Sequence, residues 1–239
     1  MDIENEEVYA TSSEATINTL IQKATSLERN KNIVKIENII KRTIDIIAGI
    51  MGVIILLPLS VCVYIVNCIF GDKGPIFYTQ TRIGKDGKEF KMYKYRSMVV
   101  GADEKLHKYL EENEEAKIEY KKYKKLKYDP RITKIGKFIR KTSIDEFPQF
   151  INILKGEMSL VGPRPYLPRE KEDVNGYLKY ITSIKPGLTG LWQTNGRSGV
   201  TFVDRLQMDM DYYYSHTLKT DVKIVIKTFL KLIRREGAI

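Results

Sequence analysis

An apolar segment without charge, residues 46–70, constrains the fold of this chain more than any other feature. As one helix it would be about 37 Å long, enough to cross a hydrocarbon core of roughly 30 Å. It begins too far from the N-terminus for an ordinary signal peptide, and no small-residue cleavage site follows it. On length alone, the segment predicts a single transmembrane helix.

Two further features favour a helix that enters one leaflet and returns. Pro58 lies near the middle of the segment, where it removes a backbone donor and should bend the helix. Both flanks are basic, with Lys31, Lys35, Lys41 and Arg42 before the segment and Lys73, Arg82, Lys85 and Lys88 after it. Cationic flanks prefer the cytoplasmic side. We therefore expect a re-entrant helix bent at Pro58, with Asp45 at the level of the lipid headgroups.

The composition indicates anionic partners and gives little support to several other chemistries. The 239 residues carry a formal net charge of +10, which attracts phosphates, nucleic acid or an acidic lipid surface. Cys62 and Cys68 both lie in the apolar segment, so we interpret them as small apolar residues and not as a disulfide or metal pair. His107 and His216 lie far apart in sequence, which argues against His-based zinc chemistry or a Ser–His relay.

Beyond the apolar segment, the pattern predicts a small hairpin followed by helices. Residues 76–80 and 89–95 are typical of two strands, and the intervening Asp86-Gly87 pair is a hairpin signal. A charged helix is expected over residues 102–127, acidic at first and basic later. Its basic half is either a solvated face or a surface lying on anionic headgroups.

The rest of the chain is expected to be helical apart from one loop. Short helices are predicted over residues 132–140 and from Ser143 onward, with a loop rich in proline and glycine over residues 156–168. Asp221 should open a last helix with an apolar side formed by Val222, Val225, Phe229 and Ile233. That side either packs on the core or lies in the membrane interface.

These elements define an α+β, mainly helical fold of three parts. Residues 1–38 form a polar extension with weak helical periodicity over residues 15–27, and residues 39–71 form the membrane helix. Residues 72–239 form a compact cytosolic domain with a small sheet and interfacial amphipathic helices. We find no internal repeat.

The adjacent acids Asp145 and Glu146 are the strongest candidates for chemistry. One interpretation is structural: Ser143 as N-cap and Glu146 three residues later form a capping box, which leaves Asp145 free. Near a helix N-terminus, the helix dipole and Arg140 would hold Asp145 ionised. An ionised carboxylate can attack phosphorus and form an acyl phosphate. Glu146 could then hold a magnesium ion, which favours few carboxylates plus phosphate oxygens.

Two arginines have the setting of phosphate ligands. Arg164 lies between two prolines, so its backbone is stiff, and its guanidinium can bind phosphate oxygens in bidentate fashion. Arg197 lies between two glycines, where the backbone can approach a ligand closely. Each could equally be a surface arginine. No Walker-type or dinucleotide-binding glycine pattern is present.

Ordered motifs along the chain resemble the bacterial sugar transferases, the monotopic polyprenyl-phosphate phosphoglycosyl transferases that start polysaccharide assembly. The matching stretches are Lys41-Arg42-Thr43-Ile44-Asp45, Thr81-Arg82-Ile83-Gly84, residues 90–98, residues 129–133, residues 135–149, residues 154–159, Val161-Gly162-Pro163-Arg164-Pro165, residues 185–193 and Arg235-Glu236-Gly237-Ala238.

The resemblance implies a two-step reaction. The aspartate, here Asp145, attacks the sugar-bearing phosphate of a UDP-sugar and releases UMP, and the phosphate of a polyprenyl carrier, expected to be undecaprenyl phosphate, then displaces the aspartate. Glu146 corresponds to the acid that engages Mg²⁺ beside Asp145. The residues matching the family's phosphate-binding cations and a further active-site acid are Lys94, Arg140, Arg164, Arg197 and Asp221.

The resemblance also implies a location: the cytoplasmic face of a bacterial cell membrane, in exopolysaccharide or capsule synthesis. The family's bend motif is usually Ser-Pro, whereas Leu57 precedes Pro58 here, and Ser60 could partly substitute for the missing hydroxyl. No group of membrane helices precedes Lys41, as expected of the short, single-anchor members.

Several points stay open at the level of sequence. Residues 209–213 and 221–224 resemble members that transfer galactose or glucose phosphate, but an N-acetylated sugar and a homo-oligomer are both compatible with the sequence. A rival hypothesis is a non-catalytic membrane adaptor that binds acidic lipids or a polysaccharide-export partner. Nucleic-acid binding through residues 121–127 lacks any recognisable motif and is not expected.

Overall fold

The computed structural model describes residues 31–72, 74–195 and 200–234. Three features of the sequence analysis lie outside the described residues: the predicted helix at residues 15–27, the candidate phosphate ligand Arg197 and the motif at residues 235–238. The described chain is mainly helical, with two sheets of two strands each. This confirms the expected mainly helical α+β class.

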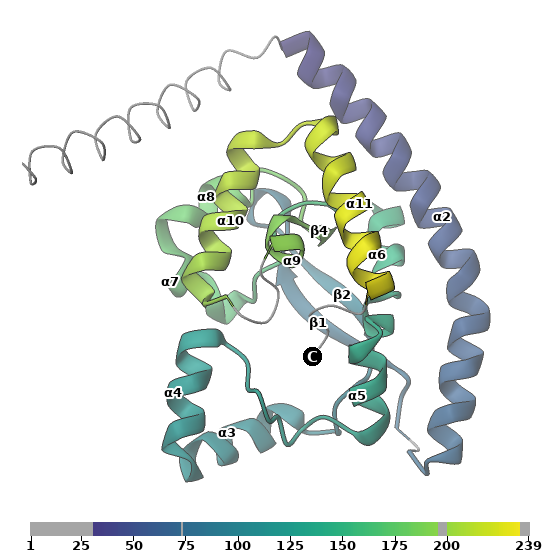
Figure 1. Cartoon of the computed structure of the whole chain (residues 1–239), viewed down its shortest axis with the longest axis vertical. Coiled ribbons are helices and arrows are strands. Elements are labelled where there is room, and N and C mark those ends of the chain that lie inside the picture. The colour runs from purple at the N-terminus through teal and green to yellow at the C-terminus, as the bar shows by residue number, and fades with distance from the viewer. Residues whose placement is uncertain (1–30, 73, 196–199, 235–239) are drawn as a thin grey trace, which may run out of the picture.

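Helix α2 (Lys31–Ile69) contains the apolar segment and runs continuously through Pro58. Figure 1 shows it bowed along one side of the other elements. Its stretch Ile33–Ile69 is long and apolar enough to cross a membrane, judged by length and composition within the described residues. Ser60 donates a hydrogen bond to the Leu56 carbonyl (2.7 Å). This is the carbonyl four residues before Ser60, whereas Pro58 leaves the Ile54 carbonyl without its usual donor, so the substitution for the missing serine stays a prediction.

One face of α2 is buried against the domain. Asp45, Gly49, Gly52, Leu56 and Val63 are buried, and their spacing of three, four or seven residues places them on one side of the helix. The opposite side exposes a row of large apolar residues that includes Ile47, Ile54, Leu57, Val61 and Ile65. The helix therefore has one face for the protein and one for an apolar environment.

Two glycines allow α2 to approach helix α6 (Gln149–Lys155) closely. A Cβ atom added at Gly49 would overlap Leu154, and one added at Gly52 would overlap the ring of Phe150. The absence of side chains at these two positions sets the distance between the helices.

The predicted hairpin is confirmed. Strands β1 (Phe77–Ile83) and β2 (Glu89–Tyr95) pair antiparallel, and the short 3₁₀ turn η1 (Lys85–Gly87) connects them. Asp86 and Gly87 both adopt positive φ, 57° and 74°, which is the conformation that Asp-Gly turns supply at low cost.

The single helix predicted over residues 102–127 is wrong. The structure has α3 (Ala102–Glu112) and α4 (Glu114–Tyr123) instead. Asn113 is extended between them (φ −136°, ψ 98°), and its side chain donates to the Tyr109 carbonyl (3.0 Å). This local hydrogen bond competes with the helical backbone pattern and breaks the run.

The next helices surround the acid pair. Helix α5 (Lys134–Lys141) is capped by Thr133, whose hydroxyl accepts from the Gly136 amide (2.9 Å). The expected helix from Ser143 is instead the 3₁₀ turn η2 (Ile144–Glu146), and α6 begins only after Pro148. Ser143 has φ 57° and its side chain makes no cap hydrogen bond. The capping-box interpretation is therefore wrong.

A second, parallel sheet was not predicted. Strand β3 (Ser159–Val161), inside the predicted loop, pairs with β4 (Gly187–Thr189). The backbones of Gly162 and Gly187 cross so closely that a Cβ on either would overlap the backbone of the other segment. These glycines explain why the two motifs meet.

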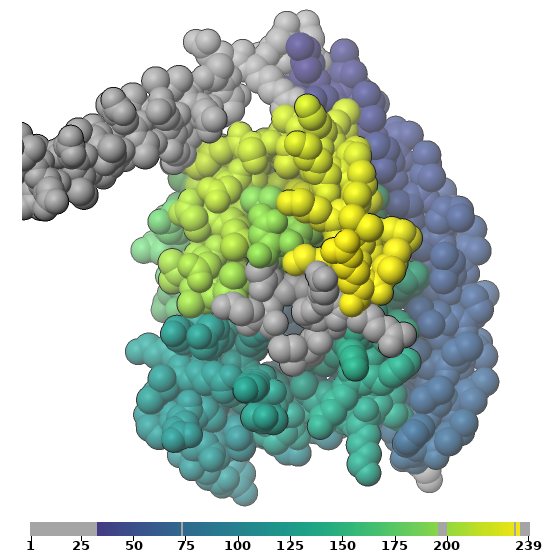
Figure 2. Space-filling model, viewed as in Figure 1, coloured from purple at the N-terminus to yellow at the C-terminus, as the bar shows by residue number. Residues whose placement is uncertain are grey.

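The remaining elements are short helical turns and three helices, of which α11 packs on this sheet. They are η3 (Pro168–Glu170), α7 (Lys171–Val174), η4 (Asn175–Tyr177), α8 (Leu178–Ile181), α9 (Leu191–Asn195), α10 (Phe202–Ser215) and α11 (Leu218–Arg234). In the space-filling view of Figure 2, α10 and α11 lie beside one another on the viewer's face, with α2 along one edge.

The last helix begins earlier than predicted, and its apolar side is open. Helix α11 starts at Leu218 and not at Asp221. Ile224 is buried in the core, whereas Val222, Phe229 and Ile233 are exposed. The interpretation in which this side packs on the core is therefore wrong for those residues.

Candidate active site

A tight turn places the acid pair inside the domain. Helix α5 ends at Lys141, and the left-handed backbone of Ser143 reverses the chain before η2. The Ser143 amide donates to the Arg140 carbonyl (3.1 Å), and the Glu146 amide donates to the Ser143 carbonyl (3.2 Å). A non-glycine residue held at positive φ carries a modest conformational cost, a feature that concentrates at functional sites.

Lys94 on β2 faces both acids. Its Nζ lies 3.0 Å from Glu146 Oε1 and 3.9 Å from Asp145 Oδ2. Asp145 is only 9% exposed, whereas the Glu146 side chain is 41% exposed. The pair therefore consists of one buried carboxylate and one that reaches the surface, with a cation between them.

Burial raises the pKa of Asp145 to about 6, against the pull of Lys94, while the nearby Glu146 adds to the rise and Arg140 opposes it. We expected a helix dipole and Arg140 to hold this acid ionised; Arg140 acts in that direction, but burial shifts the pKa upward. Desolvation outweighs the cations because the carboxyl group is almost enclosed. Asp145 is still mainly ionised at neutral pH, and its basicity exceeds that of an ordinary aspartate.

Arg164 is fixed by contacts on several sides. Its backbone amide donates to both carboxylate oxygens of Asp209 (3.3 Å each), and its Nη2 lies 3.4 Å from Glu170 Oε1. Its guanidinium also lies over the rings of Tyr166 and Trp192, at 5.7 Å and 5.9 Å from their centroids. The two flanking prolines and these contacts hold the side chain in one place.

Asp209, which holds the Arg164 backbone, is fully enclosed. Burial raises the pKa of Asp209 to about 7, although the Tyr166 hydroxyl and the Arg164 amide donate to it and favour its ionised form. The Tyr166 hydroxyl lies 2.6 Å from Asp209 Oδ2. This buried acid supports the segment that carries Arg164.

The structure brings part of the predicted site together. Lys94, Arg140, Asp145 and Glu146 form one group, since Lys94 and Arg140 both act on the pKa of Asp145. Among the described residues, Arg164 contacts Asp209, Glu170 and the two aromatic rings and not the acid pair. Its charge reaches Lys125, whose pKa is lowered by burial and by Arg205, Arg140 and Arg164. Arg197 lies outside the described residues.

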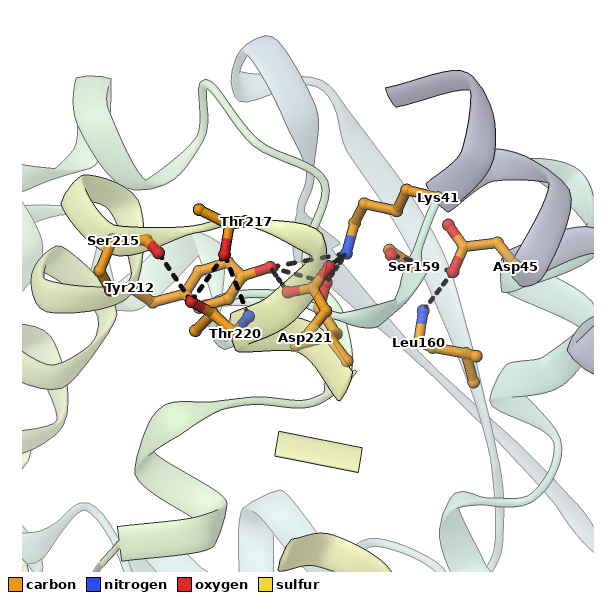
Figure 3. Close-up of polar contacts among 10 residues, drawn as sticks. Lys41, Asp45, Ser159, Leu160, Tyr212, Ser215, Thr217, Thr220 and Asp221 are labelled. Atoms are coloured by element: carbon orange, nitrogen blue, oxygen red, sulfur yellow. Dashed lines mark hydrogen bonds and ion pairs between the residues drawn. The ribbon is translucent and has the colours of Figure 1, made fainter. Parts of the chain in front are cut away.

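Asp221 lies in a different network. Its carboxylate forms an ion pair with Lys41 of α2 and accepts a hydrogen bond from the Tyr212 hydroxyl (2.7 Å). Lys41 also donates to the Val161 carbonyl (2.9 Å). Figure 3 shows the Lys41 amine pointing at Asp221 and Tyr212, from helices distant in sequence. In the structure, Asp221 joins α2 to α11, while its predicted role toward substrate stays a prediction.

Two other charged residues of α2 bind the same domain. Asp45 accepts from the Leu160 amide (2.8 Å) and the Ser159 hydroxyl (3.0 Å), as Figure 3 also shows. Arg42 donates to the last carbonyls of α6, at Ile153 (2.7 Å) and Leu154 (2.9 Å). The Asp45 side chain is thus buried against β3, and its expected place at the level of the headgroups stays a prediction.

A magnesium ion at the acid pair would be held by two carboxylates and not by a cage of protein ligands. Among the described residues, no group of three or more His, Cys, Asp or Glu side chains gathers as a metal cage. Magnesium commonly takes one or two carboxylates and completes its shell with substrate phosphate oxygens and water. Asp145 and Glu146 supply such a partial set of hard oxygen donors.

Sequence reasoning missed a group of buried polar residues on α10. Arg205, Asp209 and Tyr212 are buried together with the apolar Leu206 and Met210. The apolar residues at helical spacing were a usable signal, because polar residues on the same face as a core stripe must find buried partners.

The chain is similar in sequence to proteins of one family. The profile of the family described as "Bacterial sugar transferase" matches residues 36–235. The chain is 46% identical over 199 residues to the undecaprenyl-phosphate galactose phosphotransferase of Salmonella typhimurium, covering 83% of this chain and 41% of that protein. It is 44% identical over 213 residues to an uncharacterized sugar transferase of Haemophilus influenzae, covering 89% and 45%.

A shorter relative matches over most of its length. The chain is 41% identical over 204 residues to the exopolysaccharide production protein ExoY of Sinorhizobium fredii, covering 85% of this chain and 89% of that protein. The chain therefore belongs to the bacterial sugar transferase family. It spans less than half the length of the Salmonella and Haemophilus relatives.

Proposed function

We propose that this chain transfers a sugar 1-phosphate from a UDP-sugar to undecaprenyl phosphate and releases UMP. The observation that carries the proposal is the buried Asp145 carboxylate beside Lys94, Glu146 and Arg140. The Salmonella relative is named for undecaprenyl phosphate and galactose, and the Sinorhizobium relative for exopolysaccharide production. The reaction would be the first membrane step of exopolysaccharide or capsule synthesis.

The chemistry proceeds by two displacements at one phosphorus atom. An Asp145 oxygen attacks the phosphorus that bears the sugar, the bond to the UMP oxygen breaks, and an acyl phosphate forms on the enzyme. A phosphate oxygen of the lipid carrier then attacks the same phosphorus and frees the carboxylate. Lys94 and Arg140 offset the repulsion between the carboxylate and the phosphates.

The raised pKa of Asp145 suits this role. A more basic carboxylate is a better attacking group, and at about 6 it still leaves the group ionised at neutral pH. Mg²⁺, held by Glu146 and Asp145, would neutralise charge on the diphosphate.

The packing of α2 supports a monotopic, re-entrant arrangement. Lys41 and Asp45 near its beginning contact β3 and α11. Leu56 and Val63, further along, lie in one cluster with Ile139 of α5. Because both halves of α2 pack on the same polar domain, a helix that crossed the bilayer would draw this domain into the lipid. We therefore place α2 in one leaflet, with both ends and the domain on the cytoplasmic face.

The open side of α11 supports contact with the same membrane surface. Val222, Phe229 and Ile233 are exposed on a helix that also carries Lys223 and Lys227. An exposed apolar row flanked by lysines is typical of a helix lying in the interface. The domain would thus rest on the headgroups.

The decisive experiment measures UMP release from a panel of UDP-sugars with magnesium and undecaprenyl phosphate. We expect Asp145→Asn to abolish release, and the panel to identify the sugar. The Asn variant should fold normally, because it removes a charge whose burial is unfavourable. Asp211→Asn, at an exposed carboxylate on α10, is the matched control and should retain activity.

Two outcomes would contradict the proposal. Near-normal turnover in Asp145→Asn would exclude this residue as the nucleophile. Binding of acidic lipids with no UMP release from any UDP-sugar would favour the non-catalytic adaptor.

A further inference from the structure

Lys125 lies two residues after Tyr123, whose carbonyl oxygen accepts from Arg205, and it contacts no acidic side chain of the described residues. It is half-buried in the segment between α4 and α5, and its side chain makes no hydrogen bond or ion pair with any of the described residues. Burial, together with the charges of Arg205, Arg140 and Arg164, lowers its pKa to about 8, while Glu119 opposes them in part. A half-buried lysine in such company is stabilised when an anion binds.

Arg164 and Arg205 share one aromatic support. Their guanidiniums lie 5.9 Å and 5.7 Å from the centroid of the Trp192 ring. Arg205 is held by the carbonyl oxygens of Tyr123 and Thr201, and its pKa falls to about 10 through burial and the charge of Arg164. The protein therefore holds two guanidiniums against the same ring, close enough for the charge of Arg164 to act on Arg205.

The tryptophan itself has an unused donor. Trp192 Nε1 is buried and has no hydrogen-bond partner among the described residues. A buried donor without a partner costs free energy, so native structures usually reserve such groups for a ligand or water. It is a second and independent sign of a polar ligand at this cluster.

The cluster and α2 lie on different sides of the nucleophile. Ile144, next to Asp145, packs in the cluster that contains Leu56 and Val63 of α2. Helix α4 ends just before Lys125, and α10 carries Arg205. Figure 1 shows both helices on the opposite side of the molecule from α2. A lipid phosphate would reach Asp145 from the α2 side, whereas a soluble ligand can occupy the far side.

We propose that Lys125, Arg164 and Arg205 form a second phosphate subsite, which binds the phosphate of the nucleotide leaving group. The inference rests on the proposed function and deepens it. When Asp145 attacks, the broken bond leaves its electron pair on UMP, a phosphate monoester that gains negative charge. Cations fixed on that side stabilise the leaving group as charge develops. The charge of Arg140 acts on both Asp145 and Lys125 and so links the two subsites electrostatically.

The test compares two phosphate monoesters by equilibrium dialysis against the full chain in nanodiscs. One ligand is UMP and the other is farnesyl phosphate, a short analogue of the lipid carrier. We expect Lys125→Met to weaken UMP binding about tenfold or more, the range for a lost charge-assisted hydrogen bond, and to leave farnesyl phosphate within about twofold. Lys125→Arg should restore UMP binding. Lys121→Met, at an exposed lysine on α4, is the control and should bind as wild type.

Fluorescence adds a readout of position, because Trp192 is the only tryptophan in the chain. UMP should change its emission, and uridine, which lacks the phosphate, should not. Wild-type affinity for UMP in Lys125→Met would overturn the subsite. A loss confined to farnesyl phosphate would overturn its assignment to the nucleotide.

The subsite and the proposed function can fail separately. Asp145→Asn should bind UMP with wild-type affinity, since it leaves the cation cluster intact. Activity in that variant would refute the nucleophile but not the subsite. Normal UMP binding in Lys125→Met, with Asp145→Asn inactive, would refute the subsite alone.

Discussion

Removing the Asp221 carboxylate should loosen the attachment of α2 to the domain. Asp221 and Lys41 form an ion pair whose side chains are only 13% and 21% exposed. The same carboxylate accepts the Tyr212 hydroxyl at 2.7 Å. In Asp221→Ala, both donors lose their partner, and Lys41 keeps only the Val161 carbonyl at 2.9 Å and a long contact with Tyr212.

The expected cost follows from this geometry. Removing one member of a buried ion pair costs about 3–5 kcal/mol, and partial exposure of both side chains reduces this to about 2–4 kcal/mol. Asp221→Asn keeps an acceptor for Tyr212 and loses the charge, so its cost should be smaller, about 1–2 kcal/mol.

Urea unfolding of the full chain at fixed detergent concentration measures both costs. Lys41→Met and the double variant Lys41→Met/Asp221→Asn complete a double-mutant cycle. Because the two side chains touch, we expect a coupling energy of at least about 1 kcal/mol. If Asp221→Ala unfolds like the wild type but loses turnover, the reasoning is refuted, and Asp221 acts on substrate, as the family resemblance implied.

Three other predictions concern the nucleophile, the metal and the helix crossing. Turnover should fall as pH drops below about 6, where Asp145 takes up its proton. Lys94→Met removes a cation that lowers this pKa, so the acidic limb of the pH–rate profile should move to higher pH in that variant. A profile unchanged in that variant would contradict the assignment. Chelation should stop UMP release, and added Mg²⁺ should restore it. The Glu146→Gln variant should need more Mg²⁺ to reach its half-maximal rate. Activity of the wild-type chain in EDTA would contradict the requirement for magnesium. Gly52→Ala should destabilise the chain by about 1–2 kcal/mol, because overlap with Phe150 outweighs the gain in helix propensity; thermal unfolding of the variant, with and without Phe150→Ala to restore space, measures it.

Local sequence patterns were sufficient to predict helix α2 and the hairpin β1–β2. The apolar segment predicted α2, because a segment of that length without charge is typical of a membrane helix. The Asp86-Gly87 turn gave the hairpin β1–β2, since both residues tolerate positive φ. The acid pair and Arg164 were identified as candidates from residue type and motif, and the family followed from the order of motifs.

Only the tertiary structure decided how these pieces meet. Sheet β3–β4 joins residues far apart in sequence through a backbone crossing at Gly162 and Gly187, and no local pattern contains that information. The capping box does not form because Ser143 adopts a left-handed backbone and its side chain makes no cap hydrogen bond. The direction of the Asp145 pKa shift likewise depends on enclosure, which sequence does not report.

The difference between the features that the sequence predicted and those that it did not has one physical cause. Helix and turn preferences act over a few residues and can be read from the chain, whereas burial and charge pairing depend on which segments come together. Lys41 and Asp221 are separated by most of the chain, yet packing of α2 beside α11 makes them partners. The sequence by itself determined which residues could bind or attack a phosphate, and the packed fold decided which of them share a site.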